Sequence, residues 1–128
     1  MIKGANATVF VSDLDRAVQF YRDVLGLKLQ FQAGKEFAQF DAGSGTMIAL
    51  HPAGPHSPKP GSRGAIQVGF GLDQPLDQVV KTLQGKGVAF RGPIVDDPPV
   101  RLAFFGDLDG NDLYLCEYGG QGSYTKHA

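Results

Sequence analysis

The spacing of hydrophobic residues changes near the start of the chain. Ala7, Val9 and Val11 alternate with Thr8 and Phe10 in a β-branched and aromatic run, and this period of two predicts a β-strand. Ser12 then suits a helix N-cap, and the apolar side chains of residues 14–25 fall on one helical stripe. Gly26 stands where a glycine commonly ends a helix. This stretch therefore predicts a strand, a helix and a second strand that begins at Leu27.

The remainder of the first half has the pattern of strands separated by short turns. Gly34 in the first turn and Gly43 and Gly45 in the second can adopt the positive φ that tight hairpins require. We predict strands at residues 27–32, 36–42 and 46–51.

A Pro-, Gly- and Ser-rich stretch, residues 52–64, has no apolar periodicity and predicts a linker. After it the same order of elements returns. Pro75 suits the first position of a helix, and residues 107–111 have the Asp and Gly-Asn composition of a tight turn. Residues 96–99, two aspartates followed by two prolines, are interpreted as a loop. We predict a helix at residues 75–84 and strands at 65–72, 88–91, 100–105 and 112–118.

The two halves of the chain can be aligned with each other. Asn6 and Gln67 lie 61 positions apart, and Leu50 and Leu115 lie 65 apart, so the halves differ by insertions in the hairpins, where insertions are tolerated. This repeat predicts an α+β fold of two tandem βαβββ modules, in which the strands form a curved mixed sheet. One helix would cover one face in each module, and the uncovered faces would line a shared cavity. The predicted organisation is a single domain of residues 1–128, with module one at about 5–51, a linker at 52–64, module two at about 65–118 and a flexible tail at 119–128.

Composition narrows the class of protein. The chain has 128 residues, 42% of them hydrophobic and 20% charged, which is typical of one soluble globular domain. Its net charge of −1 gives no reason to expect nucleic acid as a partner. The single cysteine cannot form an internal disulfide and fits a reducing compartment. The sequence shows no long apolar segment of the kind that forms a signal peptide or a membrane span. We therefore expect a cytoplasmic protein with no membrane partner.

Several short motifs resemble one known superfamily. They are Val-Ser-Asp-Leu-Asp-Arg-Ala at residues 11–17, Phe20-Tyr21, Leu-Gly-Leu at residues 25–27 and Asp-Leu-Asp-Gly-Asn at residues 107–111. Together they resemble the vicinal oxygen chelate superfamily, which includes glyoxalases, bleomycin-resistance proteins and ring-cleaving dioxygenases. The resemblance extends from about residue 2 to residue 118, and Leu108 departs from it, because the family usually has proline there. It implies the glyoxalase/bleomycin resistance/dihydroxybiphenyl dioxygenase fold and favours a homodimer.

The resemblance also implies where a metal ion would be held. Metal-using members place a His on the first strand and a Glu on the last strand of each module. The matching positions here hold Asn6 and Ala49 in the first module and Gln67 and Tyr114 in the second. Neutral amides, a methyl group and a phenol are poor ligands for a divalent cation. We therefore expect no metal and no other cofactor at this place.

A relocated site is an alternative that the sequence leaves open. Strand alternation places His51 and Cys116 at corresponding positions, 65 apart, on the faces expected to line the cavity. Such a pair could bind a metal or act as base and nucleophile. The simpler interpretation is that Cys116 is a small buried hydrophobe and that His51 is solvated beside the linker.

The same faces offer a pocket for a small molecule. Gly69 and Gly71 alternate on the cavity face, where they would leave room for a ligand or relieve sheet curvature. Phe37 and Phe40 face opposite ways, so one of them would supply a stacking wall. Arg101 would bind a ligand anion from an apolar strand, or it would pair structurally with an acidic neighbour such as Asp112 or Glu117. The candidate ligand-binding residues are Asn6, Thr8, Phe10, His51, Gln67, Arg101 and Tyr114.

These observations lead to competing functional hypotheses. The leading one is a metal-free protein that sequesters a drug or metabolite in the cavity between modules, as the resemblance to the bleomycin-resistance branch implies. The alternative is a metal-dependent glyoxalase-like lyase, isomerase or dioxygenase that uses unforeseen ligands such as His51. A third is a metal-free enzyme with Tyr114 as acid or base. The sequence does not decide whether the protein is an enzyme, and it identifies no catalytic residue.

Overall fold

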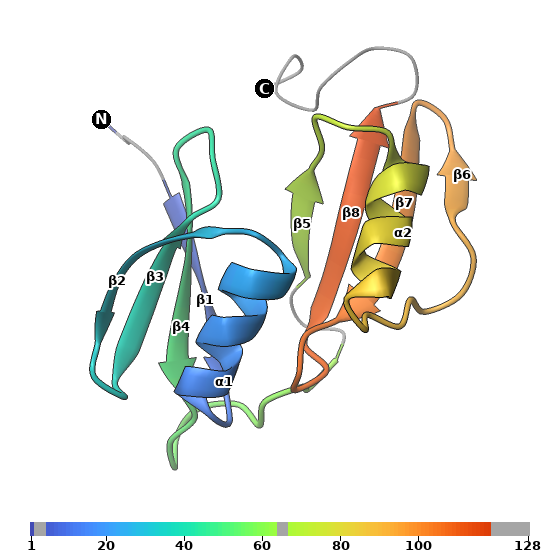
Figure 1. Ribbon diagram of the computed structural model, residues 1–128. Helices are drawn as coiled ribbons and strands as arrows, with labels where there is room; N and C mark the ends of the chain where they lie inside the picture. Colours follow the sequence, from blue (N-terminus) through green and yellow to red (C-terminus); the bar gives the residue numbers. More distant parts are fainter. Residues whose placement is uncertain (2–4, 64–66, 119–128) are drawn as a thin grey trace. The chain divides into compact units, whose positions relative to one another are not determined.

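The computed structural model describes residues 1, 5–63 and 67–118, which form two units (Figure 1). The first unit comprises Met1–Arg63 together with Asp107–Asn111, and the second comprises Gly64–Gly106 and Asp112–Ala128. Each unit contains one four-stranded sheet. The predicted tail at residues 119–128 and the beginning of the strand predicted at 65–72 lie outside the described residues. Within the described part of the chain, no helix has the length and apolar character needed to cross a membrane.

The first unit is a βαβββ module with strand order β1-β4-β3-β2. Strands β1 and β4 are parallel and the other pairs are antiparallel, and α1 covers one face of the sheet (Figure 1). The helical segment contributes the buried side chains of Leu14, Val18 and Tyr21 to that face. The buried side chains of the sheet include Val11, Phe40, Ile48 and Leu50. The elements are β1 (Ala5–Val11), α1 (Leu14–Gln19), the π-helical segment η1 (Phe20–Val24), β2 (Lys28–Ala33), β3 (Phe37–Asp41) and β4 (Thr46–Pro52).

The second unit repeats this arrangement with strand order β5-β8-β7-β6. Strands β5 and β8 are parallel, and α2 covers one face with its buried residues Leu76 and Leu83 (Figure 1). Phe105, Leu113 and Leu115 supply the buried side chains of the sheet. The elements are β5 (Val68–Gly71), α2 (Leu76–Gly85), β6 (Val95–Asp97), β7 (Val100–Gly106) and β8 (Asp112–Tyr118).

The prediction of two βαβββ modules is confirmed, with the eight strands of the described residues divided between two four-stranded sheets. One predicted strand is wrong. Residues 88–91 contribute only an isolated bridge between Phe90 and Phe105, and the edge strand is β6, which the sequence pattern suggested to be a loop. Gly92 takes a φ of +79° and is followed by Pro93, which has no backbone N–H to donate, so extended pairing stops there and resumes at β6.

The first helix begins and ends differently from the prediction. Asp13, not Ser12, is the N-cap, and its Oδ1 accepts a hydrogen bond from Arg16 N at 3.1 Å. After Gln19 the helix widens into η1, where Leu25 N donates to Phe20 O at 3.1 Å. Gly26 has a φ of +76° and ends the helix as predicted.

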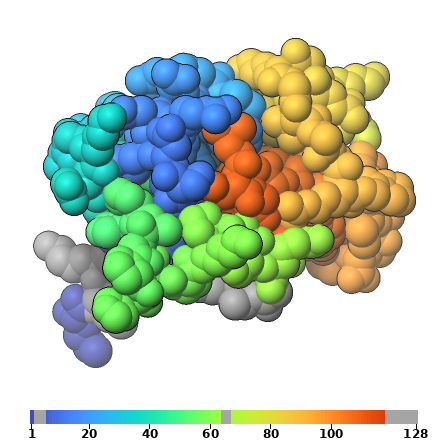
Figure 2. All heavy atoms as spheres, turned by 90° about the horizontal axis from the view of Figure 1, so that it is seen from below, coloured from blue at the N-terminus to red at the C-terminus, as the bar shows by residue number. Residues whose placement is uncertain are grey.

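The turn Asp107–Asn111 lies in the first unit although it joins strands of the second. Ser12 donates to Asp109 through both its backbone N, at 3.1 Å, and its Oγ. Tyr21 Oη donates to Asp107 Oδ2 at 2.8 Å. In the space-filling view the orange atoms of the turn lie against blue atoms of the N-terminal segment (Figure 2). Burial and the neighbouring Asp107 carboxylate raise the pKa of Tyr21 well above its ordinary value, so the phenol stays protonated as a donor.

The stretch predicted as a linker also packs within the first unit. Ala53 N donates to Val11 O at 2.9 Å, directly after the end of β4. Gly61 N donates to Asn111 Oδ1 at 2.9 Å, and Asn111 Nδ2 donates to Phe10 O at 3.1 Å. Asn111 therefore joins the residues around Gly61 to the end of β1.

Candidate functional site

The first sheet has a face that carries no helix, here called the open face. Asn6, Thr8 and Phe10 share this face because Val9 and Val11, which alternate with them, are buried on the helix side. The parallel register sets Phe10 beside His51 on β4. Strand alternation in the sequence predicted this grouping of three candidate residues with His51.

An aromatic row crosses the open face at one end; we define it as Phe10, His51, Phe37 and Phe31. The rings of Phe10 and His51 are 5.7 Å apart in an edge-to-face arrangement, and those of Phe31 and Phe37 are also 5.7 Å apart. Phe40, the alternative to Phe37, is 0% exposed in the core, so Phe37 supplies the aromatic surface. The row gives this end of the face an apolar, ring-lined character.

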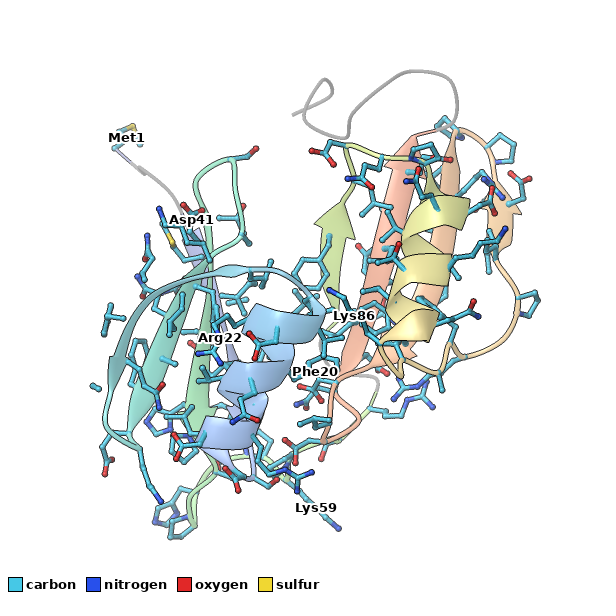
Figure 3. All side chains as sticks on the ribbon, viewed as in Figure 1. Met1, Phe20, Arg22, Asp41, Lys59 and Lys86 are labelled. Carbon is cyan, nitrogen blue, oxygen red and sulfur yellow. The ribbon has the colours of Figure 1, made fainter. Side chains whose placement is uncertain are left out.

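The rest of the open face carries polar side chains beside the apolar Met47 and Ala49 of β4. Gln39 lies next to Ala49 in the register, and its Nε2 donates to Gln30 Oε1 at 2.9 Å. Asp41, labelled in Figure 3, lies at the end of β3 before the turn to β4 and pairs in register with Lys28. The face therefore changes from aromatic rings through amides to charged groups along the strands.

The second sheet also has a helix-free face, and the side chain of Tyr114 lies on it. The Tyr114 and Phe104 rings are 5.7 Å apart on adjacent strands. The Tyr114 ring lies over Gly69, so closely that an added Cβ at Gly69 would overlap the ring atoms. Gly69 thus leaves room for Tyr114, a reason that the sequence did not indicate. Gln67, another candidate on this unit, is exposed before β5.

Cys116 lies in the second unit, on the same side of β8 as Tyr114. It is 5% exposed, and burial raises the pKa of its thiol. A raised pKa keeps the thiol protonated and lowers its reactivity, which fits a small buried hydrophobe better than a nucleophile.

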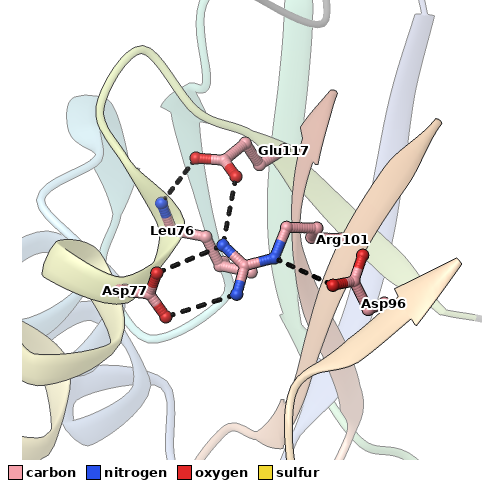
Figure 4. Close-up of polar contacts among 5 residues, drawn as sticks. All are labelled: Leu76, Asp77, Asp96, Arg101 and Glu117. Atoms are coloured by element: carbon pink, nitrogen blue, oxygen red, sulfur yellow. Dashed lines mark hydrogen bonds and ion pairs between the residues drawn. The ribbon is translucent and has the colours of Figure 1, made fainter. Parts of the chain in front are cut away.

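Arg101 lies on the opposite face from Tyr114, the face that α2 covers (Figure 4). Its guanidinium contacts Asp77 of α2 at 3.1 Å and Glu117 of β8 at 3.4 Å, with Asp96 at 4.0 Å. Glu117 also accepts a hydrogen bond from Leu76 N, at 2.8 Å, at the start of α2. These contacts argue against Arg101 as a ligand-binding residue, because they occupy its guanidinium in holding α2 on the sheet.

Replacing this arginine tests its assignment to helix packing. We expect Arg101→Gln to lower the melting temperature slightly, and the loss to shrink in high salt because the ion pairs are partly solvated. Lys81→Gln removes the same charge from the exposed face of α2 and is the matched control. Equal, salt-independent effects of the two substitutions in thermal unfolding would contradict the assignment.

The positions that the family pattern assigns to a metal do not fit one in this chain. Asn6 and Gln67 offer neutral amides, Ala49 offers no donor, and Tyr114 offers a phenol. Within residues 5–63 and 67–118, no three His, Cys, Asp or Glu side chains gather closely enough to hold a metal ion.

Sequence reasoning missed Phe31 as part of the open face. Leu29 and Phe31 are two positions apart, so a regular strand would point both side chains the same way. A bulge between them instead pairs Leu29 with Phe40 and Phe31 with Gln39. Phe31 is consequently 50% exposed. No signal in the sequence predicts the bulge.

Comparison with known proteins identifies relatives of the whole fold. The model of the Glyoxalase/Bleomycin resistance protein/Dioxygenase superfamily matches residues 5–115. TnmS3, an antibiotic binding protein from Streptomyces sp. CB03234, is 31% identical, with 93% of this chain and 98% of that chain covered and a TM-score of 0.76. A member of the same superfamily from Sphaerobacter thermophilus is 30% identical, with 91% and 98% covered and a TM-score of 0.74. A protein of Mycolicibacterium smegmatis is 32% identical over 102 residues, 79% of this chain and 81% of that protein.

Proposed function

Because the chain belongs to the Glyoxalase/Bleomycin resistance protein/Dioxygenase superfamily, we propose that it binds a small molecule without a metal ion and sequesters it. The ligand is a drug or metabolite with a planar aromatic part. The antibiotic-binding description of the similar protein TnmS3 supports this class of function. The protein acts as a cytoplasmic homodimer, a proposal that rests on the family resemblance and the reducing environment that a single free cysteine suits.

One observation carries the proposal. The positions where metal-using relatives have imidazoles and carboxylates hold Asn6, Ala49, Gln67 and Tyr114 here. These groups cannot supply the charge that a divalent cation requires, yet amides and a phenol can form hydrogen bonds with an organic ligand. Binding without metal chemistry therefore fits the residues better than metal catalysis does.

The open face of the first sheet supplies the groups that such a ligand needs. The aromatic row offers flat apolar surface for stacking, and amides such as Asn6 and Gln39 offer donors and acceptors beside it. The helix-free face of the second sheet offers the phenol of Tyr114 as a further contact. The proposed contacts are Asn6, Thr8, Phe10, Phe31, Phe37, Gln39, His51, Gln67 and Tyr114.

Calorimetry with a planar aromatic drug tests this function. Titration with doxorubicin in buffer containing EDTA should give saturable binding, and a titration in EDTA-free buffer with added Zn²⁺, Ni²⁺, Mn²⁺ or Fe²⁺ should give the same dissociation constant. Binding that requires one of these ions would refute the proposal. Stoichiometric metal in the purified protein would instead favour the alternative, a metal-dependent lyase, isomerase or dioxygenase.

Removing one ring from the aromatic row should weaken binding. We expect Phe37→Ala to raise the dissociation constant for doxorubicin about tenfold, because stacking on a side chain of this size contributes of the order of 1 kcal/mol beyond area burial. Leu108→Ala truncates an exposed apolar side chain outside the proposed contacts and is the control. An unchanged dissociation constant for Phe37→Ala, with the fold intact by circular dichroism, would exclude the aromatic row from the site.

A further inference from the structure

We propose that His51 Nε2 is a hydrogen-bond acceptor that selects ligands carrying a hydroxyl or N–H donor on their aromatic ring. This inference rests on the proposed function and specifies the ligand chemistry at the aromatic row. It follows from the way the imidazole of His51 is held by its neighbours on β4 and β1.

The hydrogen bond of His51 fixes which ring nitrogen carries the proton. Nδ1 lies 2.7 Å from the carbonyl oxygen of Pro52. A carbonyl oxygen only accepts, so Nδ1 must donate and must carry the hydrogen. In the neutral imidazole the other nitrogen, Nε2, then has a lone pair and no hydrogen. An unconstrained histidine would exchange between the two tautomers, whereas this contact selects one.

The ring is also positioned by packing. Phe10 meets it edge-to-face, with an interplanar angle of 62° and 5.7 Å between ring centres. His51 is exposed, and among the described residues Nε2 has no protein partner. The lone pair of Nε2 is therefore available to a bound molecule at the end of the face where the aromatic rings lie.

The other polar groups of the open face differ from His51 in kind. Asn6, Gln39 and Thr8 can each donate as well as accept, so none of them rejects either type of ligand group. The only N–H of the neutral His51 ring is committed to the carbonyl oxygen of Pro52, so the other ring nitrogen can only accept. A ligand hydroxyl at this place is bound, whereas an ether oxygen would place its own lone pairs against that of Nε2.

Among the described residues, the side chains beside His51 on the adjacent strands are uncharged. Phe10 of β1 pairs in register with His51, and on the other side Phe37 directly precedes Ala38, the register partner of Leu50. Asp41 and Lys28 lie at the other end of the face. Lys35 and Glu36, in the turn before β3, make no ion pair with His51, and Lys35 lies 4.0 Å from Asp15.

A matched pair of probes tests the acceptor directly. 2-Naphthol and 2-methoxynaphthalene share an aromatic skeleton, but only the first can donate a hydrogen bond. At pH 8, 2-naphthol should bind about five- to tenfold more tightly, because only its hydroxyl can donate a hydrogen bond to Nε2. Nitrogen NMR of the free protein should show His51 with its proton on Nδ1.

Variants at His51 and His56 test whether the preference for 2-naphthol depends on His51. His51→Phe keeps an aromatic ring in the row and should abolish the preference for 2-naphthol, whereas His56→Gln, in an exposed loop, should leave that preference unchanged. Equal affinities for the two probes at pH 8, or a proton on Nε2 in the free protein, would overturn the inference while leaving the proposed function standing. If the protein bound neither probe and no planar drug, the proposed function and this inference would fail together.

Discussion

Replacing Asp107 with alanine should lower the free energy of unfolding by about 3–5 kcal/mol, the cost typical of breaking a buried, hydrogen-bonded charge network. Asp107 is 8% exposed, and its carboxylate accepts hydrogen bonds from Tyr21 Oη, Asp109 N, Asn111 N and Asn111 Nδ2 at 2.8–3.0 Å. Alanine removes all of these acceptors at once. The Tyr21 hydroxyl would then be buried without its partner, which adds a desolvation penalty.

Urea unfolding followed by circular dichroism measures this effect. Asp97→Ala removes a carboxylate of the same size from an exposed position on β6 and should change the free energy of unfolding by less than about 0.5 kcal/mol. Tyr21→Phe removes one hydrogen bond and should cost about 1–2 kcal/mol, less than Asp107→Ala. Similar small losses for Asp107→Ala and Asp97→Ala would show that the turn contributes little to the fold.

Replacing Gly61 with alanine should destabilise the protein by about 2–4 kcal/mol, the combined range for left-handed strain and overpacking. Gly61 has a φ of +82°, a conformation that alanine adopts only with strain. A Cβ there would also overlap the carbonyl oxygen of Asp109, a backbone atom that cannot turn aside. Relief of the overlap would have to move the turn away from Gly61 and break the Gly61 N to Asn111 Oδ1 hydrogen bond.

Gly54→Ala is the control for this second prediction, because it lies in the same segment. A Cβ at Gly54 would meet no atom within 4 Å, and its φ is outside the left-handed region. This substitution should leave the midpoint of urea unfolding nearly unchanged. If Gly61→Ala were equally neutral, residues 53–63 would have the loose character of the predicted linker.

The architecture was predictable because alternation and helical periodicity are local signals. The period of two placed Phe10 and His51 on one face, and the structure pairs them in register. The change to a period of 3.6 after Val11 located the first helix, with an error of one residue at its cap. Asp13 is the N-cap because the Ser12 hydroxyl donates its hydrogen bond to Asp109, a residue far along the chain. A contact of that kind has no local signature.

The candidate site was less predictable for the same reason. Strand alternation alone does not reveal on which side of their sheets the side chains of Arg101 and Phe31 lie. Adjacent aromatic residues at positions 104 and 105 obscured the parity of β7, and the acidic partner Asp77 comes from a helix. In β2 a bulge reverses the side on which Phe31 lies. Gly69 was correctly noted as unusual, but only the position of Tyr114 explains it.

The placement of the Asp107–Asn111 turn in the first unit bears on how such a chain could arise by gene duplication. A fragment ending at residue 63 would contain Tyr21 without Asp107, and the repeat aligns position 107 with Ala42, which has no carboxylate to substitute. Each half alone is therefore incomplete, and a single-module ancestor would have needed a turn from a second copy. Separately expressed fragments cut between the modules should fold only when mixed, by complementation.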